Sequence, residues 1–133
     1  MKEYINELKK LTRKAIKKKE IPVACLILKD ECIIAKAYNK KEKKNDPMMH
    51  AEIIAIKKAC KKLKTWRLNE CEMIVTLRPC KMCEEIIKES RIKKVVYILE
   101  SKVTKKEVTT YEKCDTDKQY FEELLTMFFK EKR

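Results

Sequence analysis

One histidine, one glutamate and two cysteines of this chain have the types and the spacing of a metal site. His50 is followed two residues later by Glu52, and Cys80 and Cys83 follow Pro79 in a Pro-Cys-x-x-Cys motif. One imidazole and two thiolates suit Zn²⁺ and leave a fourth tetrahedral position to water, as in catalytic zinc sites. Bound zinc lowers the pKa of such a water to about 7. Glu52 would then be the group that moves its protons.

The remaining cysteines leave a second interpretation open. The chain has seven cysteines and no apparent secretory signal, which argues against a disulfide framework. Three of them lie in apolar patterns typical of small core residues: Cys25, Cys32 and Cys60. A purely structural zinc site would need a fourth protein ligand, and Cys60, Cys71 or Cys114 could supply it. His50 is the only histidine, and it stands before an amphipathic stretch, so we favour the catalytic site.

Apolar residues at helical and strand spacing indicate the elements that must hold these ligands. Helices are predicted over residues 2–18, 50–63, 80–89 and 118–130. Strands are predicted over residues 21–28, 32–38, 72–77 and 93–98, with a short further strand within 103–110. The polar, lysine-rich residues 39–47 predict a loop, and the last helix is expected to turn its phenylalanines and leucines inward.

This alternation of helices and strands defines the expected fold class. It predicts an α/β protein, a three-layer α/β/α sandwich with a central mixed sheet of about five strands. No linker or repeat divides the sequence, so residues 1–133 are expected to form a single domain. Cys80 and Cys83 share one helix face, and His50 begins another helix, so two positive helix ends would meet at the metal.

The charge balance suggests a polyanionic partner. The formal net charge is +13, from 34 lysines and arginines against 21 acidic residues. Phosphate contacts would use such a surplus, although lysine-rich surfaces are often only solvated. No apolar run approaches the roughly 20 residues of a membrane span. We therefore expect a cytoplasmic protein without a membrane partner.

Several segments resemble the tRNA adenosine deaminases of bacteria, a family within the cytidine-deaminase-like superfamily. The His-x-Glu and Pro-Cys-x-x-Cys motifs are the zinc signature of deaminases that act on nucleobases. The resemblance extends over residues 20–98. It is carried by Ile-Pro-Val at 21–23, Asn-Asp-Pro-Met-Met-His-Ala-Glu-Ile at 45–53, Val-Thr-Leu-Arg-Pro-Cys-Lys-Met-Cys at 75–83 and Ser-Arg-Ile at 90–92.

The resemblance implies a cytidine-deaminase-like fold, one Zn²⁺ per subunit and the conversion of wobble adenosine in tRNA to inosine. Zinc-bound hydroxide would attack C6 of the flipped base, with Glu52 as proton shuttle. The implied metal ligands are His50, Cys80 and Cys83. The implied substrate-binding residues are Asn39, Val23, Ala51 and Pro79. The implied partner is a tRNA anticodon stem-loop, bound by a homodimer.

Two alternatives remain beside tRNA editing. A deaminase of free cytosine, cytidine or guanine would share the zinc chemistry and need no basic groove. The stretch before the last helix, residues 98–119, is shorter than in the family, which favours this alternative, whereas the charge of +13 opposes it. A non-catalytic RNA-binding subunit is the second alternative, and the presence of Glu52 weighs against it.

Overall fold

The computed structural model of the chain describes residues 1–101 and 109–131. It separates into two units, Met1–Lys102 and Val103–Arg133, which are described here one at a time. The first unit contains α1 (Lys2–Lys17), β1 (Ala24–Lys29), β2 (Cys32–Tyr38), α2 (Lys41–Lys44), α3 (Ala51–Leu63), β3 (Cys71–Leu77), α4 (Lys81–Glu89) and β4 (Lys94–Leu99). The described part of the second unit contains α5 (Lys118–Glu131). The described elements follow the predicted order, with α2 as an additional helix.

The first unit is built around one mixed sheet with the strand order β2-β1-β3-β4. β1 pairs antiparallel with both β2 and β3, and β3 pairs parallel with β4. Parallel neighbours need a crossover connection, and α4 supplies it between β3 and β4. The carboxyl end of β3 therefore leads directly into a helix.

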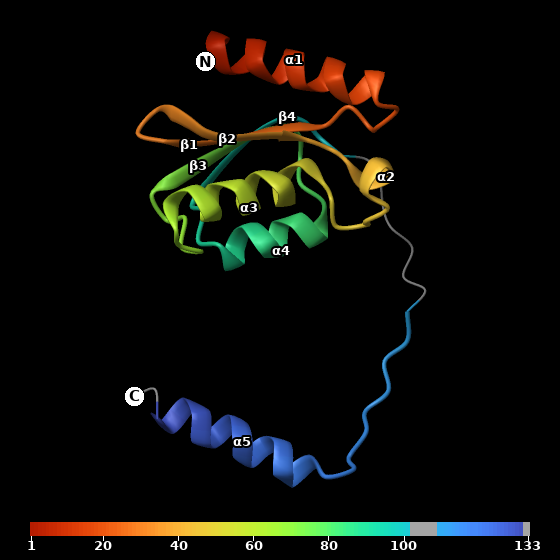
Figure 1. Ribbon diagram of the computed structural model, residues 1–133, viewed down its shortest axis with the longest axis vertical. Coiled ribbons are helices and arrows are strands. Elements are labelled where there is room, and N and C mark those ends of the chain that lie inside the picture. The colour runs from red at the N-terminus through yellow and green to blue at the C-terminus, as the bar shows by residue number, and fades with distance from the viewer. Residues whose placement is uncertain (102–108, 132–133) are drawn as a thin grey trace. The chain divides into compact units, whose positions relative to one another are not determined.

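Helices cover both faces of this sheet (Figure 1), which confirms the three-layer α/β/α prediction. α1 lies on one face and packs Leu8 and Leu11 against Leu26 of β1. α3 and α4 lie on the other face, where Cys25 and Ile27 of β1 enter the larger core cluster. Because alternate residues of β1 are buried on opposite faces, the strand reads in the sequence as an unbroken apolar run.

The sheet of the described residues has four strands, against the prediction of about five. The further strand expected within 103–110 falls largely on residues 102–108, which lie outside the described part of the chain. The mixed character of the sheet does not depend on that strand, because β1, β3 and β4 already combine antiparallel and parallel pairing.

The segment 39–47, predicted as a loop, contains the short helix α2. Apolar periodicity could not reveal this helix, because none of its residues is buried. Its first turn is held instead by hydrogen bonds from its backbone to polar side chains outside it. These bonds are described with the functional site below.

The amphipathic helix α5 forms as predicted. Because α5 belongs to the second unit, the burial of its apolar side chains stays a prediction. Helical periodicity shows that a helix has an apolar face, but it does not identify the surface that covers that face.

Candidate metal centre

Two helices begin at the same place and bring the three predicted zinc ligands together. His50 is the N-cap of α3 and Cys80 is the N-cap of α4, both with an extended backbone conformation. The Nδ1 atom of His50 lies 3.5 Å from Sγ of Cys83 and 3.7 Å from Sγ of Cys80. The ligand atoms of all three residues lie within 4.8 Å of one another. The partial positive charge of the two helix N-termini favours thiolates at this point.

The sequence explains locally why both cysteines reach the same point. Pro79 follows the end of β3 and has no backbone N–H, so it fits the break between the strand and α4. Cys83 lies in the first turn of α4, three residues after Cys80, so that both sulfurs share one side of the helix start. Cys83 is fully buried, whereas His50 and Cys80 are partly exposed, so the centre can be reached from outside.

The donor set fits zinc. One imidazole nitrogen and two sulfurs are zinc ligands, and three protein ligands are the usual number in a catalytic site. Among the described residues no other group of three histidine, cysteine or acidic side chains gathers in this way. Cys60 and Cys71, which could have closed the site, are not part of the group, and Cys71 begins β3 at the end opposite to Cys80.

Glu52 lies in the first turn of α3, two residues after the histidine ligand, and is 4% exposed. Burial raises the pKa of its carboxyl group, while hydrogen bonds from its own backbone and from Cys83 act in the opposite direction. The carboxyl group thus contacts a predicted ligand and is shielded from bulk water. Such a position suits a group that exchanges protons within the site.

The predicted substrate-binding residues lie at the end of the sheet where the metal centre is: Val23 precedes β1, Asn39 follows β2 and Pro79 follows β3. Asn39 is 5% exposed, and its backbone N–H donates to the carbonyl of Val23 at 3.1 Å. Its Oδ1 atom accepts a hydrogen bond from the backbone N–H of Lys41 at 2.8 Å. Ala51 is fully buried at the start of α3, and Pro79 is partly buried beside Cys80. The roles of these four residues in binding substrate stay predictions.

A buried carboxylate that the sequence did not reveal supports the segment between Asn39 and His50. Glu20 is 5% exposed, and its two oxygens accept hydrogen bonds from the backbone N–H groups of Glu42 and Lys43. Nothing in the pattern around Glu20 signals this role, because its partners lie more than 20 residues away and donate only backbone groups.

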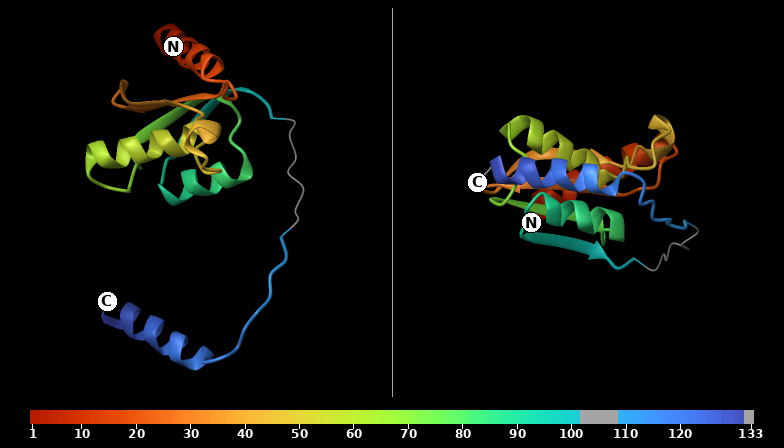
Figure 2. Two further views of the ribbon diagram at one scale, coloured as in Figure 1. Left: turned by 45° about the vertical axis from the view of Figure 1, so that its right-hand side comes forward. Right: turned by 90° about the horizontal axis from the view of Figure 1, so that it is seen from below.

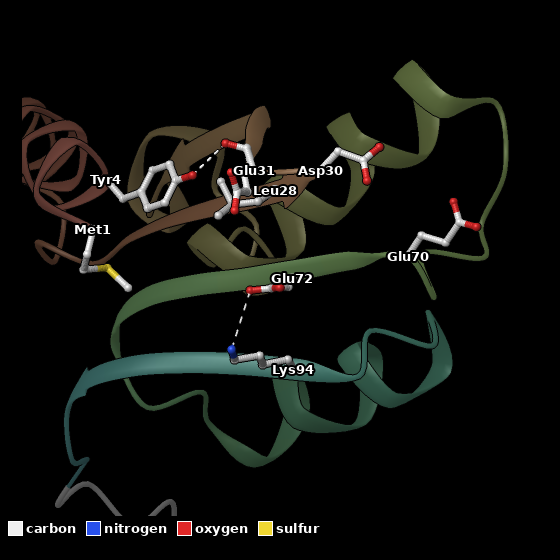
Figure 3. Close-up of a pocket in the computed structure, with 8 residues that line it drawn as sticks. All are labelled: Met1, Tyr4, Leu28, Asp30, Glu31, Glu70, Glu72 and Lys94. Atoms are coloured by element: carbon white, nitrogen blue, oxygen red, sulfur yellow. Dashed lines mark hydrogen bonds and ion pairs between the residues drawn. The ribbon is translucent and has the colours of Figure 1, made fainter.

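A hollow of the first unit lies at the other end of the sheet (Figure 3). It measures about 570 Å³ and is lined by Met1, Tyr4, Leu28, Asp30, Glu31, Glu70, Glu72 and Lys94. Glu72 forms a 4.0 Å ion pair with Lys94, and the hydroxyl of Tyr4 donates to the carbonyl of Glu31 at 2.6 Å. None of the predicted ligands lines this hollow.

A mixed sheet between helices, with a histidine and two cysteines gathered where two helices begin, defines a zinc-binding α/β protein. Comparison of the sequence with family models agrees with this class. Residues 1–99 match the model of the cytidine and deoxycytidylate deaminase zinc-binding region, and the chain belongs to this family. The three gathered side chains form a possible site for the zinc ion that this region binds.

Individual relatives extend the comparison. The tRNA-specific adenosine deaminase of Aquifex aeolicus is 47% identical over 85 residues, 64% of this chain and 56% of that protein. A solved structure from a study of A-to-I editing by tRNA:A34 deaminases has a TM-score of 0.71 at 33% identity, covering 75% of this chain and 78% of that one. Guanine deaminase from Bacillus subtilis has a TM-score of 0.73 at 26% identity, covering 87% and 91%.

The chain spans a little over half the length of the curated relatives it matches, 56% of one and 58% of another. Within the described part of the chain, no helix has the length and apolar character that crossing a membrane requires.

Proposed function

We propose that this protein is a zinc-dependent deaminase that converts the wobble adenosine of tRNA to inosine. The observation that carries the proposal is the gathering of His50, Cys80 and Cys83 within 4.8 Å, next to the buried carboxyl group of Glu52. The reaction is hydrolytic: water supplies the oxygen that replaces the exocyclic amine at C6 of adenine, and ammonia leaves.

The residues of the chain divide this chemistry between them. His50, Cys80 and Cys83 would hold the zinc ion, which when bound lowers the pKa of water and polarises it for attack. Glu52 takes the proton that the attacking water loses and delivers it to the ring nitrogen of the base. It then carries the proton of the new hydroxyl group at C6 to the amine, which leaves as ammonia. Its burial keeps bulk water from competing for that proton.

Asn39 and Val23 come from the ends of the strands beside the metal centre, and we assign them to the walls of the base pocket. Their backbones are joined by the hydrogen bond from Asn39 to the Val23 carbonyl, which fixes the two residues relative to each other. Ala51 and Pro79 lie next to the ligands His50 and Cys80, where small or rigid side chains leave room for a flat base.

A dense group of positive charge beside the site supports an RNA substrate. Four lysines occupy α2 and the residue before it: Lys40, Lys41, Lys43 and Lys44. The pKa of Lys58 is lowered, first by burial and then by the nearby charges of Lys40 and Lys36. A concentration of positive charge of this kind favours phosphate groups. We assign the anticodon stem-loop to this side of the molecule, and we propose a cytoplasmic homodimer as the working form.

A deaminase of a free base is the second candidate. Guanine deaminase from Bacillus subtilis matches the fold over a larger share of this chain than the tRNA deaminase structure does, 87% against 75%. A small substrate would need the same zinc site and Glu52, but it would not need the lysines of α2.

The two candidates are separated by a parallel deamination assay. Purified, zinc-loaded protein would be incubated with an anticodon stem-loop carrying a wobble adenosine and, in separate tubes, with guanine, cytosine and cytidine. Mass spectrometry would detect inosine or the deaminated bases. We expect inosine at the wobble position, and none with the Glu52→Ala variant. Turnover of a free base alone would replace the tRNA assignment with the second candidate.

A further inference from the structure

The buried carboxylate of Glu20 binds the backbone of a segment that approaches the metal centre. Glu20 follows α1, and its own backbone N–H donates to the carbonyl of Ala15 at 2.9 Å, which fixes the residue to the end of that helix. Its Oε1 atom accepts from the N–H of Glu42 at 3.0 Å, and its Oε2 atom accepts from the N–H of Lys43 at 2.8 Å. Both carboxylate oxygens are therefore used.

These bonds complete the N-terminus of α2. The N–H groups of the first turn of a helix have no partner within the helix. In α2, the N–H of Lys41 is bound by Oδ1 of Asn39, and those of Glu42 and Lys43 are bound by Glu20. A helix of four residues has little stability of its own, so these side-chain bonds decide whether it forms.

The same segment ends at the histidine ligand. The backbone N–H of Lys40 donates to the carbonyl of Met49 at 2.9 Å, and that of Met49 donates to the carbonyl of Asp46 at 3.2 Å. The N–H of His50 donates to the carbonyl of Met48 at 2.7 Å. The start of α2 and the residue directly before His50 are thus joined by backbone hydrogen bonds.

Positive charge around Glu20 strengthens the hold of its carboxylate on the backbone of α2. It faces a segment in which four of five residues are lysines, Lys40–Lys44 with Glu42 between them. A hydrogen bond to an ionised carboxylate is about twice as strong as one between neutral groups. An amide side chain of the same shape offers only one acceptor, and its NH₂ group would oppose the second N–H.

We propose that Glu20 is a positioning residue, whose carboxylate fixes α2 and thereby holds Asn39 and His50 in place at the metal centre. The consequence for substrate rests on the proposed function, whereas the consequence for zinc rests only on the position of His50. Groups that orient metal ligands from outside typically change metal affinity by about 10–100-fold when they are removed.

The test compares Glu20→Gln with Glu42→Gln in the full chain. Glu42 is an exposed residue of α2, and its replacement removes one negative charge, as Glu20→Gln does, but keeps every backbone donor and Glu20 itself. Zinc affinity would be measured by competition with a chelator, and backbone exchange by hydrogen–deuterium exchange of residues 40–50. We expect Glu20→Gln to weaken zinc binding about 10-fold and to accelerate exchange in this segment, and Glu42→Gln to change neither by more than about twofold.

Activity at saturating zinc separates positioning from stability. In the stem-loop assay we expect kcat/KM of Glu20→Gln to fall about 10-fold while Tm remains near that of Glu42→Gln. If the unaltered protein does not deaminate the stem-loop, the proposed function fails, but the zinc and exchange measurements still decide the role of Glu20. If Glu20→Gln is too unstable, Glu20→Asp keeps the charge but is too short to bind both N–H groups, and it should show the same loss. Faster exchange with unchanged zinc affinity in either variant would overturn the proposal.

Discussion

The polar groups at the two ends of β3 differ in how they are buried and arranged. At its carboxyl end the chain passes through Pro79 to Cys80 and Cys83, which meet His50 beside a carboxyl group that is 4% exposed. At its amino end Glu70 and Glu72 line the hollow of about 570 Å³, with side chains 73% and 51% exposed. Figure 2 shows the first unit from two further sides, with α3 and α4 together on one face of the sheet.

The difference shows what makes a reactive site in this fold. The hollow at the amino end has volume and charge, but Glu70 and Glu72 are solvated and form ion pairs with the partly exposed Lys29 and the exposed Lys94. Exposed ion pairs of this kind contribute little to the free energy of folding. At the carboxyl end two helix N-termini converge on soft ligands, and burial keeps Glu52 away from bulk water. Convergent side chains around a buried carboxyl group, rather than a large cavity, mark the site.

Removing a ligand at the carboxyl end should have the largest effect. Cys83→Ala deletes the fully buried sulfur that lies 3.5 Å from Nδ1 of His50. Only two protein ligands would remain among the described residues, too few to retain zinc. We expect the zinc content, measured by inductively coupled plasma mass spectrometry, to fall from about one ion per chain to near zero. Undiminished zinc in the folded variant would remove Cys83 from the ligand set.

Replacing the buried acid should separate metal binding from catalysis. Glu52→Ala leaves all three ligands in place, so the zinc content should stay at about one ion per chain. Turnover should fall by about 10²–10⁴-fold, because no other group moves the protons. The rate would be followed as inosine formation in the stem-loop. Near-native turnover would show that Glu52 is not the proton shuttle.

Neutralising the lysines beside the site should weaken RNA binding and leave the metal centre unchanged. Replacing Lys40, Lys41, Lys43 and Lys44 by glutamine removes four positive charges from α2 and its start. We expect the affinity for the stem-loop to fall at least 10-fold, and the plot of log affinity against log salt to flatten by about one unit for each lost phosphate contact. Zinc content is the control. An unchanged salt slope would place the RNA elsewhere.

The smallest effect is expected at the amino end of β3. Glu72→Gln breaks the exposed ion pair with Lys94 and removes charge from the large hollow. Zinc content and turnover should stay within about twofold of the unaltered protein, and the free energy of unfolding should change by less than about 1 kcal/mol. Chemical denaturation and the same deamination assay measure both. A loss comparable to that of Glu52→Ala would make the acidic hollow part of the active site.

The sequence predicts those parts of the fold that depend on local pattern. The i, i+3 spacing of Cys80 and Cys83 at a helix start, and the place of His50 before an amphipathic stretch, predicted the three side chains that the structure gathers. The apolar runs likewise predicted the four described strands. The signal is clearest for β1 and β3, because these strands are buried on both faces.

Features that depend on hydrogen bonds between distant parts of the chain could not be predicted from the sequence. α2 has no apolar face and is held by Glu20, whose partners are 22 and 23 residues away. The periodicity of α5 predicts an apolar face but does not specify the surface that covers it, so the burial of that face stays a prediction. The expected fifth strand rested on residues whose pattern is neither clearly apolar nor alternating.

The most direct test of the metal centre is zinc X-ray absorption spectroscopy of the zinc-loaded full chain. An open site built by His50, Cys80 and Cys83 predicts two sulfurs at about 2.3 Å, with nitrogen and oxygen ligands at about 2.0–2.1 Å completing a four-coordinate shell. Three or more sulfurs in the first shell would contradict this account, because a further cysteine, such as Cys114, would then close the position that the reaction requires.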